Sequence, residues 1–148
     1  MSGFDNVEST PLTTQERPLV LVVDDDDGIR EGLSEMLEDA GFSTVGARHG
    51  LEALTLLGTM SAPPTFILLD LMMPIMDGWA FCDSREKSRA LSEIPVIVIS
   101  ATEVAEWNRP PGVDAFLPKP IDVEQFAWLA VRMAGRKDAR TPTSALLH

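Results

Sequence analysis

Five polar side chains each stand at the end of a short apolar run, where they could act together: Asp24, Asp25, Asp70, Ser100 and Lys119. Carboxylates that converge in a low dielectric repel one another strongly, so their convergence predicts a hard divalent cation with oxygen ligands, and Mg²⁺ is the natural candidate. A metal, a carboxylate, a hydroxyl and an ammonium are the parts of a phosphoryl-transfer site. In such a site Asp70 is the nucleophile, while Lys119 and Ser100 contact phosphoryl oxygens.

The apolar runs predict the elements that position these groups. We expect five strands and four helices between them, with strands at 19–23, 44–45, 66–69, 96–99 and 115–117 and helices at about 29–40, 50–57, 79–87 and 123–134. Strands that are apolar on both faces and alternate with helices form a parallel sheet covered on both sides. The prediction is one α/β domain whose ligands bind at the carboxyl ends of the strands.

The chain has 148 residues, which suits a single domain with its own core. We place this domain at 18–135, between a disordered N-terminal tail at 1–17 and a flexible C-terminal tail at 136–148, because both ends are polar and lack periodicity. Within the domain, Asp26 or Asp27 is expected to cap the first helix, and Asp77-Gly78 to begin a later one. The lone cysteine, Cys82, is predicted to be a core or half-buried residue.

Charge and hydropathy exclude several classes of partner. With 12 Lys and Arg against 23 Asp and Glu, the net charge of −11 repels phosphate backbones and anionic lipids. We therefore expect no direct binding to nucleic acid or membrane. Neither a secretory signal nor an apolar run of about 18 residues is present, which favours a cytoplasmic location.

Four ordered segments resemble the receiver domain of bacterial response regulators: LVVDD at 21–25, LLDLMMP at 68–74 with MDG at 76–78, VISA at 98–101 and DAFLPKP at 114–120. The resemblance covers about residues 18–135, and four motifs in order are far more specific than any one of them. It implies a doubly wound, flavodoxin-like sheet of five parallel strands in the order 2-1-3-4-5.

The resemblance also implies a role for each site residue. Asp70 would accept a phosphoryl group from the phosphohistidine of a histidine kinase or a histidine phosphotransfer protein. Asp25 and Asp70 would hold Mg²⁺ together with the backbone carbonyl of Met72, and Asp24 would assist through a metal-bound water.

A second set of residues matches the family's switch. Ser100 and Phe116 would move together: the hydroxyl moves toward the phosphoryl group and the ring turns inward to fill the vacated space. Phe116 lacks the hydroxyl of the Tyr often found there, so the inward state would rest on packing. Lys119-Pro120 resembles a cis peptide that aims the ammonium into the site.

The segment between Ser100 and Phe116 departs from the family pattern, because Pro110-Pro111 cannot lie inside a helix. We predict a helix of about two turns at most, or an irregular loop, where receivers have their fourth helix. That region commonly carries output and dimerisation contacts in the family, so we expect a monomer or weak dimer. Trp107 is then either a contact for a partner protein or a residue tucked over the sheet.

Together these features predict a stand-alone response regulator, since no output domain follows Gly135, with an unknown downstream protein as its target. By resemblance, Met72 and Thr102 flank the path of the attacking water, and neither orients water well, so we expect slow self-dephosphorylation and a switch rather than an enzyme. Two alternatives remain open: a phosphorylation-independent scaffold that signals through the fourth-helix region, and a small phosphatase with an aspartyl nucleophile.

Overall fold

The computed structural model describes residues 17–101 and 103–138. Most of the predicted N-terminal tail, Thr102 and the end of the predicted C-terminal tail therefore lie outside the described residues. Among the described residues, no helix is long and apolar enough to cross a membrane.

Five strands form one parallel sheet: β1 (Leu19–Val23), β2 (Ser43–Ala47), β3 (Phe66–Asp70), β4 (Val96–Ser100) and β5 (Ala115–Pro118). Their order is β2-β1-β3-β4-β5, which confirms the predicted topology. Every residue of β3 and β4 is buried, as expected for strands covered on both faces. Pairing of Asp70 with Ile99 and of Ser100 with Pro118 aligns the carboxyl ends of these strands at one edge.

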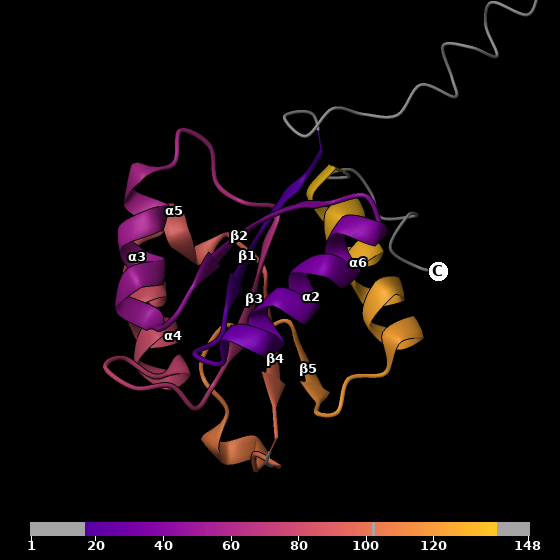
Figure 1. Cartoon of the computed structure of the whole chain (residues 1–148). Helices are drawn as coiled ribbons and strands as arrows, with labels where there is room; N and C mark the ends of the chain where they lie inside the picture. The colour runs from indigo at the N-terminus through magenta and orange to yellow at the C-terminus, as the bar shows by residue number, and fades with distance from the viewer. Residues whose placement is uncertain (1–16, 102, 139–148) are drawn as a thin grey trace, which may run out of the picture.

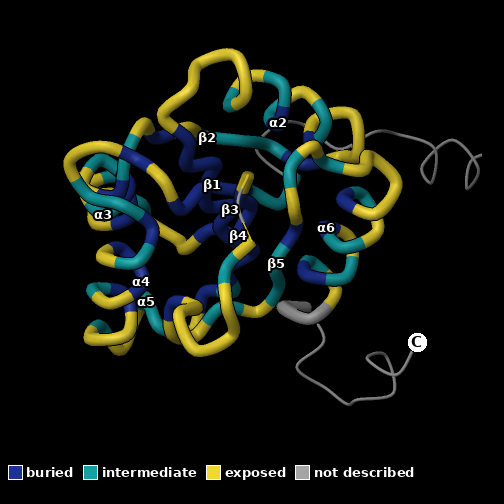
Figure 2. Tube along the Cα trace, turned by 90° about the horizontal axis from the view of Figure 1, so that it is seen from below, coloured by how far each residue is buried: buried dark blue, intermediate teal, exposed yellow. Residues whose placement is uncertain are grey.

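Helices cover both faces of the sheet (Figure 1). Helices α2 (Asp27–Asp39) and α6 (Val123–Asp138) lie on one face, and α3 (Gly50–Thr59), α4 (Gly78–Glu86) and the unpredicted short α5 (Arg89–Ser92) lie on the other. Each face has its own apolar cluster: Leu37 and Phe126 belong to the first, and Leu57 and Phe81 to the second. Figure 2 shows the resulting pattern, with the central strands β1, β3 and β4 buried, the edge strands β2 and β5 less so, and the outer sides of the helices exposed. Cys82 is fully buried on α4, as predicted.

Aspartate side chains cap the N-termini of α2 and α4. Asp26 accepts a hydrogen bond of 2.9 Å from the backbone N–H of Ile29, and Asp77 accepts one of 2.9 Å from that of Ala80. Both capping predictions are thereby confirmed. The run of four acids after β1 is consequently divided between capping by Asp26 and a different role for its first two members.

The connection from β4 to β5 contains only one turn of 3-10 helix, η1 (Glu106–Asn108), among its described residues. This confirms the prediction of a short or irregular fourth helix. Buried Pro110 follows it, and Gly112 adopts φ 74°, a left-handed conformation that suits glycine. Trp107 is 86% exposed, so the alternative in which it tucks over the sheet is wrong.

The last helix extends further than predicted. It reaches Asp138 rather than Ala134, so residues 136–138, which were placed in the flexible C-terminal tail, are helical. Arg and Lys are good helix formers and are favourable near a helix C-terminus, and no proline stops the helix here. The absence of apolar periodicity after Ala134 therefore did not mark the end of the helix.

Candidate functional site

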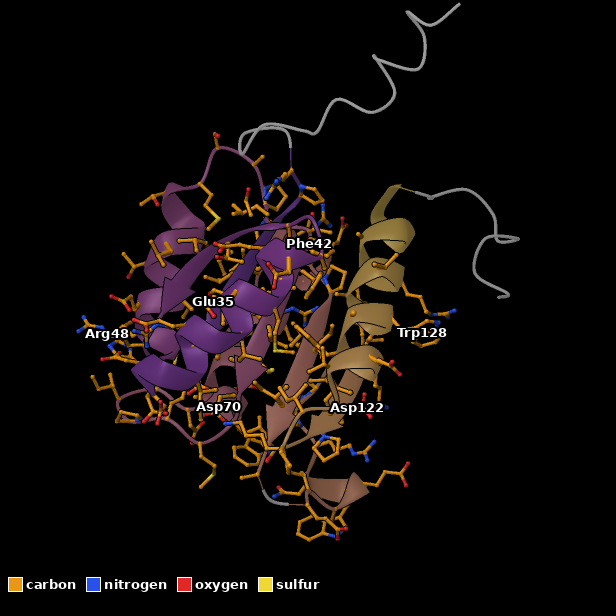
Figure 3. The ribbon with its side chains drawn as sticks, turned by 45° about the vertical axis from the view of Figure 1, so that its right-hand side comes forward. Glu35, Phe42, Arg48, Asp70, Asp122 and Trp128 are labelled. Atoms are coloured by element: carbon orange, nitrogen blue, oxygen red, sulfur yellow. The ribbon has the colours of Figure 1, made fainter. Side chains whose placement is uncertain are left out.

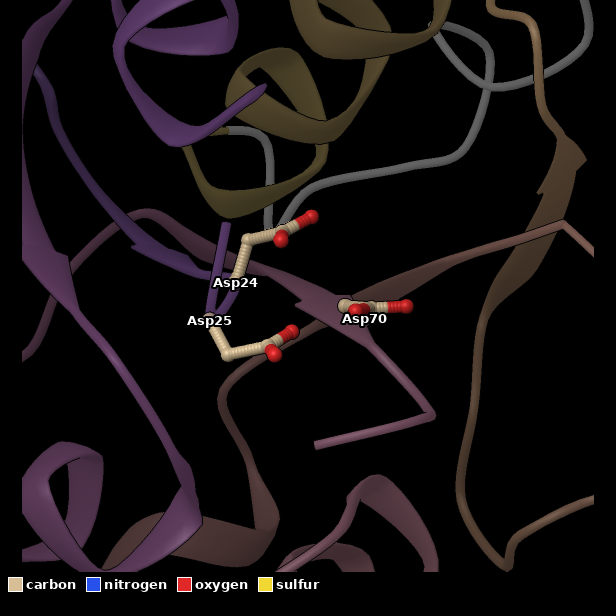
Figure 4. A group of neighbouring side chains, drawn as sticks. All are labelled: Asp24, Asp25 and Asp70. Carbon is tan, nitrogen blue, oxygen red and sulfur yellow. The ribbon is translucent and has the colours of Figure 1, made fainter. Parts of the chain in front are cut away.

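Three carboxylates meet at the carboxyl edge of the sheet (Figure 4). Asp24 and Asp25 follow β1, Asp70 ends β3, and one oxygen of each lies within 4.8 Å of the others. Asp24 and Asp70 are 1% and 5% exposed, whereas Asp25 is open to solvent. A cluster of carboxylate oxygens with one open side is a donor set that suits a hard divalent cation such as Mg²⁺. The three carboxylates predicted to hold the metal are thus brought together, while the predicted fourth ligand, the carbonyl of Met72, stays a prediction.

The ammonium of Lys119 partly neutralises this cluster. Its Nζ lies 3.3 Å from Oδ2 of Asp24 and 3.6 Å from Oδ1 of Asp70. Burial and then the charge of Asp24 raise the pKa of Asp70 to about 6, while Lys119 and a backbone hydrogen bond from Met72 act in the opposite direction. One ammonium therefore does not offset the desolvation and repulsion of these carboxylates, so a second cation would stabilise the ionised site.

The backbone around Asp24 is fixed on several sides. One oxygen of its carboxylate accepts a hydrogen bond of 2.9 Å from the N–H of Asp26. The guanidinium of Arg30 donates to the carbonyl of Asp24 over 2.8 Å and also pairs with Asp27. Arg30 was not among the site residues predicted from the sequence. The signal was present, because Asp27 and Arg30 have the i, i+3 spacing of a helical ion pair.

Ser100 and Lys119 are held side by side by the pairing of β4 with the end of β5. The backbone N–H of Lys119 donates to the carbonyl of Ser100 over 2.9 Å. The Lys119-Pro120 peptide is cis, as the family resemblance implied. Ser100 is 5% exposed, so its hydroxyl lies at a buried strand end near the acidic cluster rather than in solvent.

The loop between β3 and α4 follows Asp70 closely and carries Met72, which is 62% exposed. The N–H of Gly78 donates to the carbonyl of Leu71 over 2.9 Å, and a Cβ at Gly78 would lie only 2.7 Å from Cα of Leu71. Glycine is therefore required where α4 begins beside this loop. Ile75 has φ 68°, which is unusual for a β-branched residue and marks local backbone strain.

The predicted switch residues share one pocket. Ser100 and Phe116 line a cavity of about 610 Å³ at the carboxyl end of β4. Phe116 is partly buried, and the guanidinium carbon of Arg109 lies 4.5 Å from the centre of its ring. Nothing in the sequence indicated this pairing, because Arg109 lies in an irregular segment. Thr102, the other residue predicted to flank the water path, is outside the described residues.

Comparisons with known proteins agree with this geometry. The family model of the response regulator receiver domain matches residues 20–129. The chain is 32% identical over 131 residues to the DNA-binding dual master transcriptional regulator RpaA of Synechocystis, covering 86% of this chain and 53% of that protein. It is 36% identical over 127 residues to the response regulator MprA of Mycolicibacterium vanbaalenii, covering 83% of this chain and 52% of that protein. The chain thus spans about half the length of these relatives.

A solved structure extends the likeness to the fold. The signal receiver domain of a signal transduction histidine kinase from Syntrophus aciditrophicus superimposes with a TM-score of 0.75 at 28% sequence identity. The match covers 88% of this chain and 99% of that domain. The acidic cluster, the lysine and the switch pocket therefore lie in a fold that is shared over nearly the whole described region.

Proposed function

Because this chain belongs to the response regulator receiver domain family, we propose that it acts as a phosphorylation switch in two-component or phosphorelay signalling. Asp70 is the proposed acceptor, with a histidine kinase or a histidine phosphotransfer protein as donor. The observation that carries this proposal is the position of Asp70: it is 5% exposed, in contact with Lys119 and within a cluster of three carboxylates. A buried carboxylate in that setting is suited to chemistry rather than to solvation.

In the proposed reaction an oxygen of Asp70 attacks the phosphorus of a phosphohistidine. The P–N bond breaks as the P–O bond forms, and the departing imidazole keeps the electron pair of the broken bond and takes up a proton. Lys119 is placed to pair with a phosphoryl oxygen, and Ser100 to donate a hydrogen bond to another. A bound Mg²⁺, held by Asp25, Asp70 and the carbonyl of Met72 with Asp24 acting through water, would neutralise charge on the phosphoryl oxygens.

Phosphorylation is proposed to shift the domain between two conformations through Ser100 and Phe116. The chain would promote its own phosphorylation and lose the group slowly, because Met72 beside the site supplies no acid or amide to orient water.

Exposed Trp107 is the proposed contact for a downstream protein, in a monomer or weak dimer. The expected lack of nucleic-acid binding stays a prediction for this chain, since one relative is named as DNA-binding.

Intact mass after incubation with acetyl phosphate and Mg²⁺ tests the proposed function. We expect one added phosphoryl group on the unaltered chain and none on Asp70→Asn or without metal. Asp83→Asn is the matched control, because it removes a carboxylate from the exposed side of α4 and should label normally. Labelling of Asp70→Asn at full stoichiometry would identify a different acceptor, and no labelling of the unaltered chain would favour the scaffold alternative. Turnover of a generic phosphomonoester would indicate the phosphatase alternative.

A further inference from the structure

We propose that Arg109 is a latch on the switch: its guanidinium holds the ring of Phe116 in the resting state, and the change that follows phosphorylation has to break this contact. The inference rests on the proposed function, because it names a residue that sets the balance between the two states of the same site. It assigns a role to a residue that is not part of the acidic cluster.

The contact itself is well defined. The guanidinium carbon of Arg109 lies 4.5 Å from the ring centre of Phe116, within the range of a cation–π interaction. Phe116 is only partly buried, in contrast to the other phenylalanines in the described part of the chain, Phe42, Phe66, Phe81 and Phe126. A planar guanidinium stacked on a partly exposed ring covers apolar surface that would otherwise meet water. The contact therefore favours the ring position in which it is made.

The ring has space to leave this position. Ser100, Arg109 and Phe116 line the same cavity of about 610 Å³, together with Glu103, Val104, Ala105, Leu117 and Pro118. We infer that a turn of the Phe116 ring toward Ser100 would take it away from the guanidinium that now covers it. An interaction made in only one of two states shifts the balance between them by its own free energy. Arg109 thus opposes the inward turn of Phe116.

The residues on either side of Arg109 are held in place by the fold. The preceding residue, Asn108, accepts a hydrogen bond of 2.6 Å from Nε1 of Trp79 on α4, and the following residue, Pro110, is buried. The backbone of Arg109 is therefore held on both sides. Because the anchor is an indole, movement of this segment should change the environment of Trp79. The emission of Trp79 is consequently an internal reporter of the latch.

Arg109→Ala removes the guanidinium without disturbing the core, because Arg109 is exposed. A cation–π interaction of ordinary strength corresponds to a roughly 2- to 30-fold change in the ratio of the two states. We expect this variant to accept a phosphoryl group from acetyl phosphate faster than the unaltered chain, within that range. Arg109→Lys keeps the charge but loses the planar stack, so it should fall between the two.

The matched control is Arg132→Ala. The guanidinium carbon of Arg132 lies 4.6 Å from the ring centre of Trp128 on α6, so this variant removes a cation–π contact of the same kind on a helix that does not line the pocket of Ser100 and Phe116. It should leave the labelling rate unchanged. Phe116→Leu removes the ring, and adding Arg109→Ala to it should then give no further increase in rate, because the partner of the guanidinium is already absent.

Fluorescence provides a readout that is independent of the chemistry. In a Trp107→Phe, Trp128→Phe background, the emission of Trp79 should change on incubation with acetyl phosphate and Mg²⁺. In unphosphorylated protein, Arg109→Ala should already move the emission part of the way, whereas Arg132→Ala, which in this background removes an arginine on the opposite face of the sheet from Trp79, should not. Two results would contradict the latch, provided that the unaltered chain is phosphorylated by acetyl phosphate. In the first, Arg109→Ala slows phosphorylation. In the second, it changes neither the rate of phosphorylation nor the emission of Trp79. If the unaltered chain does not label, the proposed function fails, whereas the fluorescence of unphosphorylated Arg109→Ala still tests the contact.

Discussion

Asp70 is an ionisable group whose surroundings oppose its charge. Burial and the neighbouring Asp24 raise its pKa to about 6, and the attraction of Lys119 offsets only part of this effect. The arrangement leaves a carboxylate that is poorly stabilised when alone, and the proposed reaction with a phosphorus centre would need a cation beside it. The chemical behaviour of the domain is therefore concentrated in a few side-chain contacts at one edge of the sheet.

The raised pKa of Asp70 predicts how stability depends on pH in metal-free protein. The folded state holds the Asp70 proton more tightly than the unfolded state, so the free energy of unfolding falls as the pH rises from 3.8 to about 6 and then levels off. Asp70→Asn removes the ionisable group and therefore this fall in the free energy of unfolding. It should be more stable than the unaltered chain at pH 7, by up to about 3 kcal/mol, and nearly equal to it below pH 3.8.

Urea unfolding in a chelator on both sides of this pH window measures the effect. Asp83→Asn serves as the control, because its carboxylate is 64% exposed and is not part of the acidic cluster. A stability difference between Asp70→Asn and the unaltered chain that does not vary with pH would contradict the assignment of the raised pKa to Asp70.

Lys119 should be needed for phosphorylation more than for folding. Lys119→Met removes the ammonium that contacts Asp24 and Asp70, and we expect labelling by acetyl phosphate to slow roughly 100-fold, as when one stabilising donor is lost from an active site. Initial rates from intact mass test this expectation. Lys87→Met, which breaks an exposed ion pair with Asp83, should label normally. Equal rates for the two variants would exclude the proposed role of Lys119.

At the scale of elements, the site depends on how tightly the loop after β3 approaches α4. Gly78→Ala would place a Cβ 2.7 Å from Cα of Leu71, in a position where backbone must move. We expect a loss of roughly 1–3 kcal/mol in the free energy of unfolding. Gly58→Ala makes the same change where there is room for it. Gly58 lies in α3, and the added Cβ would meet no atom of another element within 4 Å, so we expect the free energy of unfolding to rise by about 0.5–1 kcal/mol.

Thermal and urea unfolding followed by circular dichroism compare the two glycine variants. The pair shares the same chemical change, so helix propensity alone would stabilise both. Stabilisation of Gly78→Ala would show that the loop can shift away from α4, and the close approach described above would then not be a constraint on the site.

At the scale of the whole molecule, the candidate site occupies one edge of the sheet, and large apolar side chains are exposed elsewhere among the described residues. The acidic cluster and the switch pocket lie at the carboxyl ends of the strands, whereas Trp128 projects outward from the far side of α6 (Figure 3). Trp128 is 59% exposed and Trp107 is 86% exposed, which is high for such large apolar side chains. Binding at this edge should couple to global stability, since the ends of β1, β3, β4 and β5 all contribute residues to it.

Mg²⁺ should raise the stability of the whole domain. At a concentration ten times its dissociation constant, a cation that binds only the folded state adds about 1.4 kcal/mol, which is a few degrees in melting temperature for a domain of this size. Asp25→Asn should reduce the shift by weakening the site, and Asp83→Asn should not. An unchanged melting temperature of the unaltered chain at millimolar Mg²⁺ would count against the metal site.

The sequence alone determined the strands, their parallel arrangement and the edge at which the polar groups meet, because buried strands are apolar on both faces and end at abrupt polar residues. It also limited any helix in the β4–β5 connection to about two turns, since Pro110-Pro111 cannot lie inside a helix. Only the tertiary structure decided which acid of the run after β1 caps a helix and which is buried, and how close Lys119 lies to Asp70. Such distances depend on strand register and loop packing, which join residues far apart in the chain. For the same reason the contact between Arg109 and Phe116 has no pattern in the sequence. Arg109 lies in an irregular segment and Phe116 in a strand, and the two meet only after the sheet has formed.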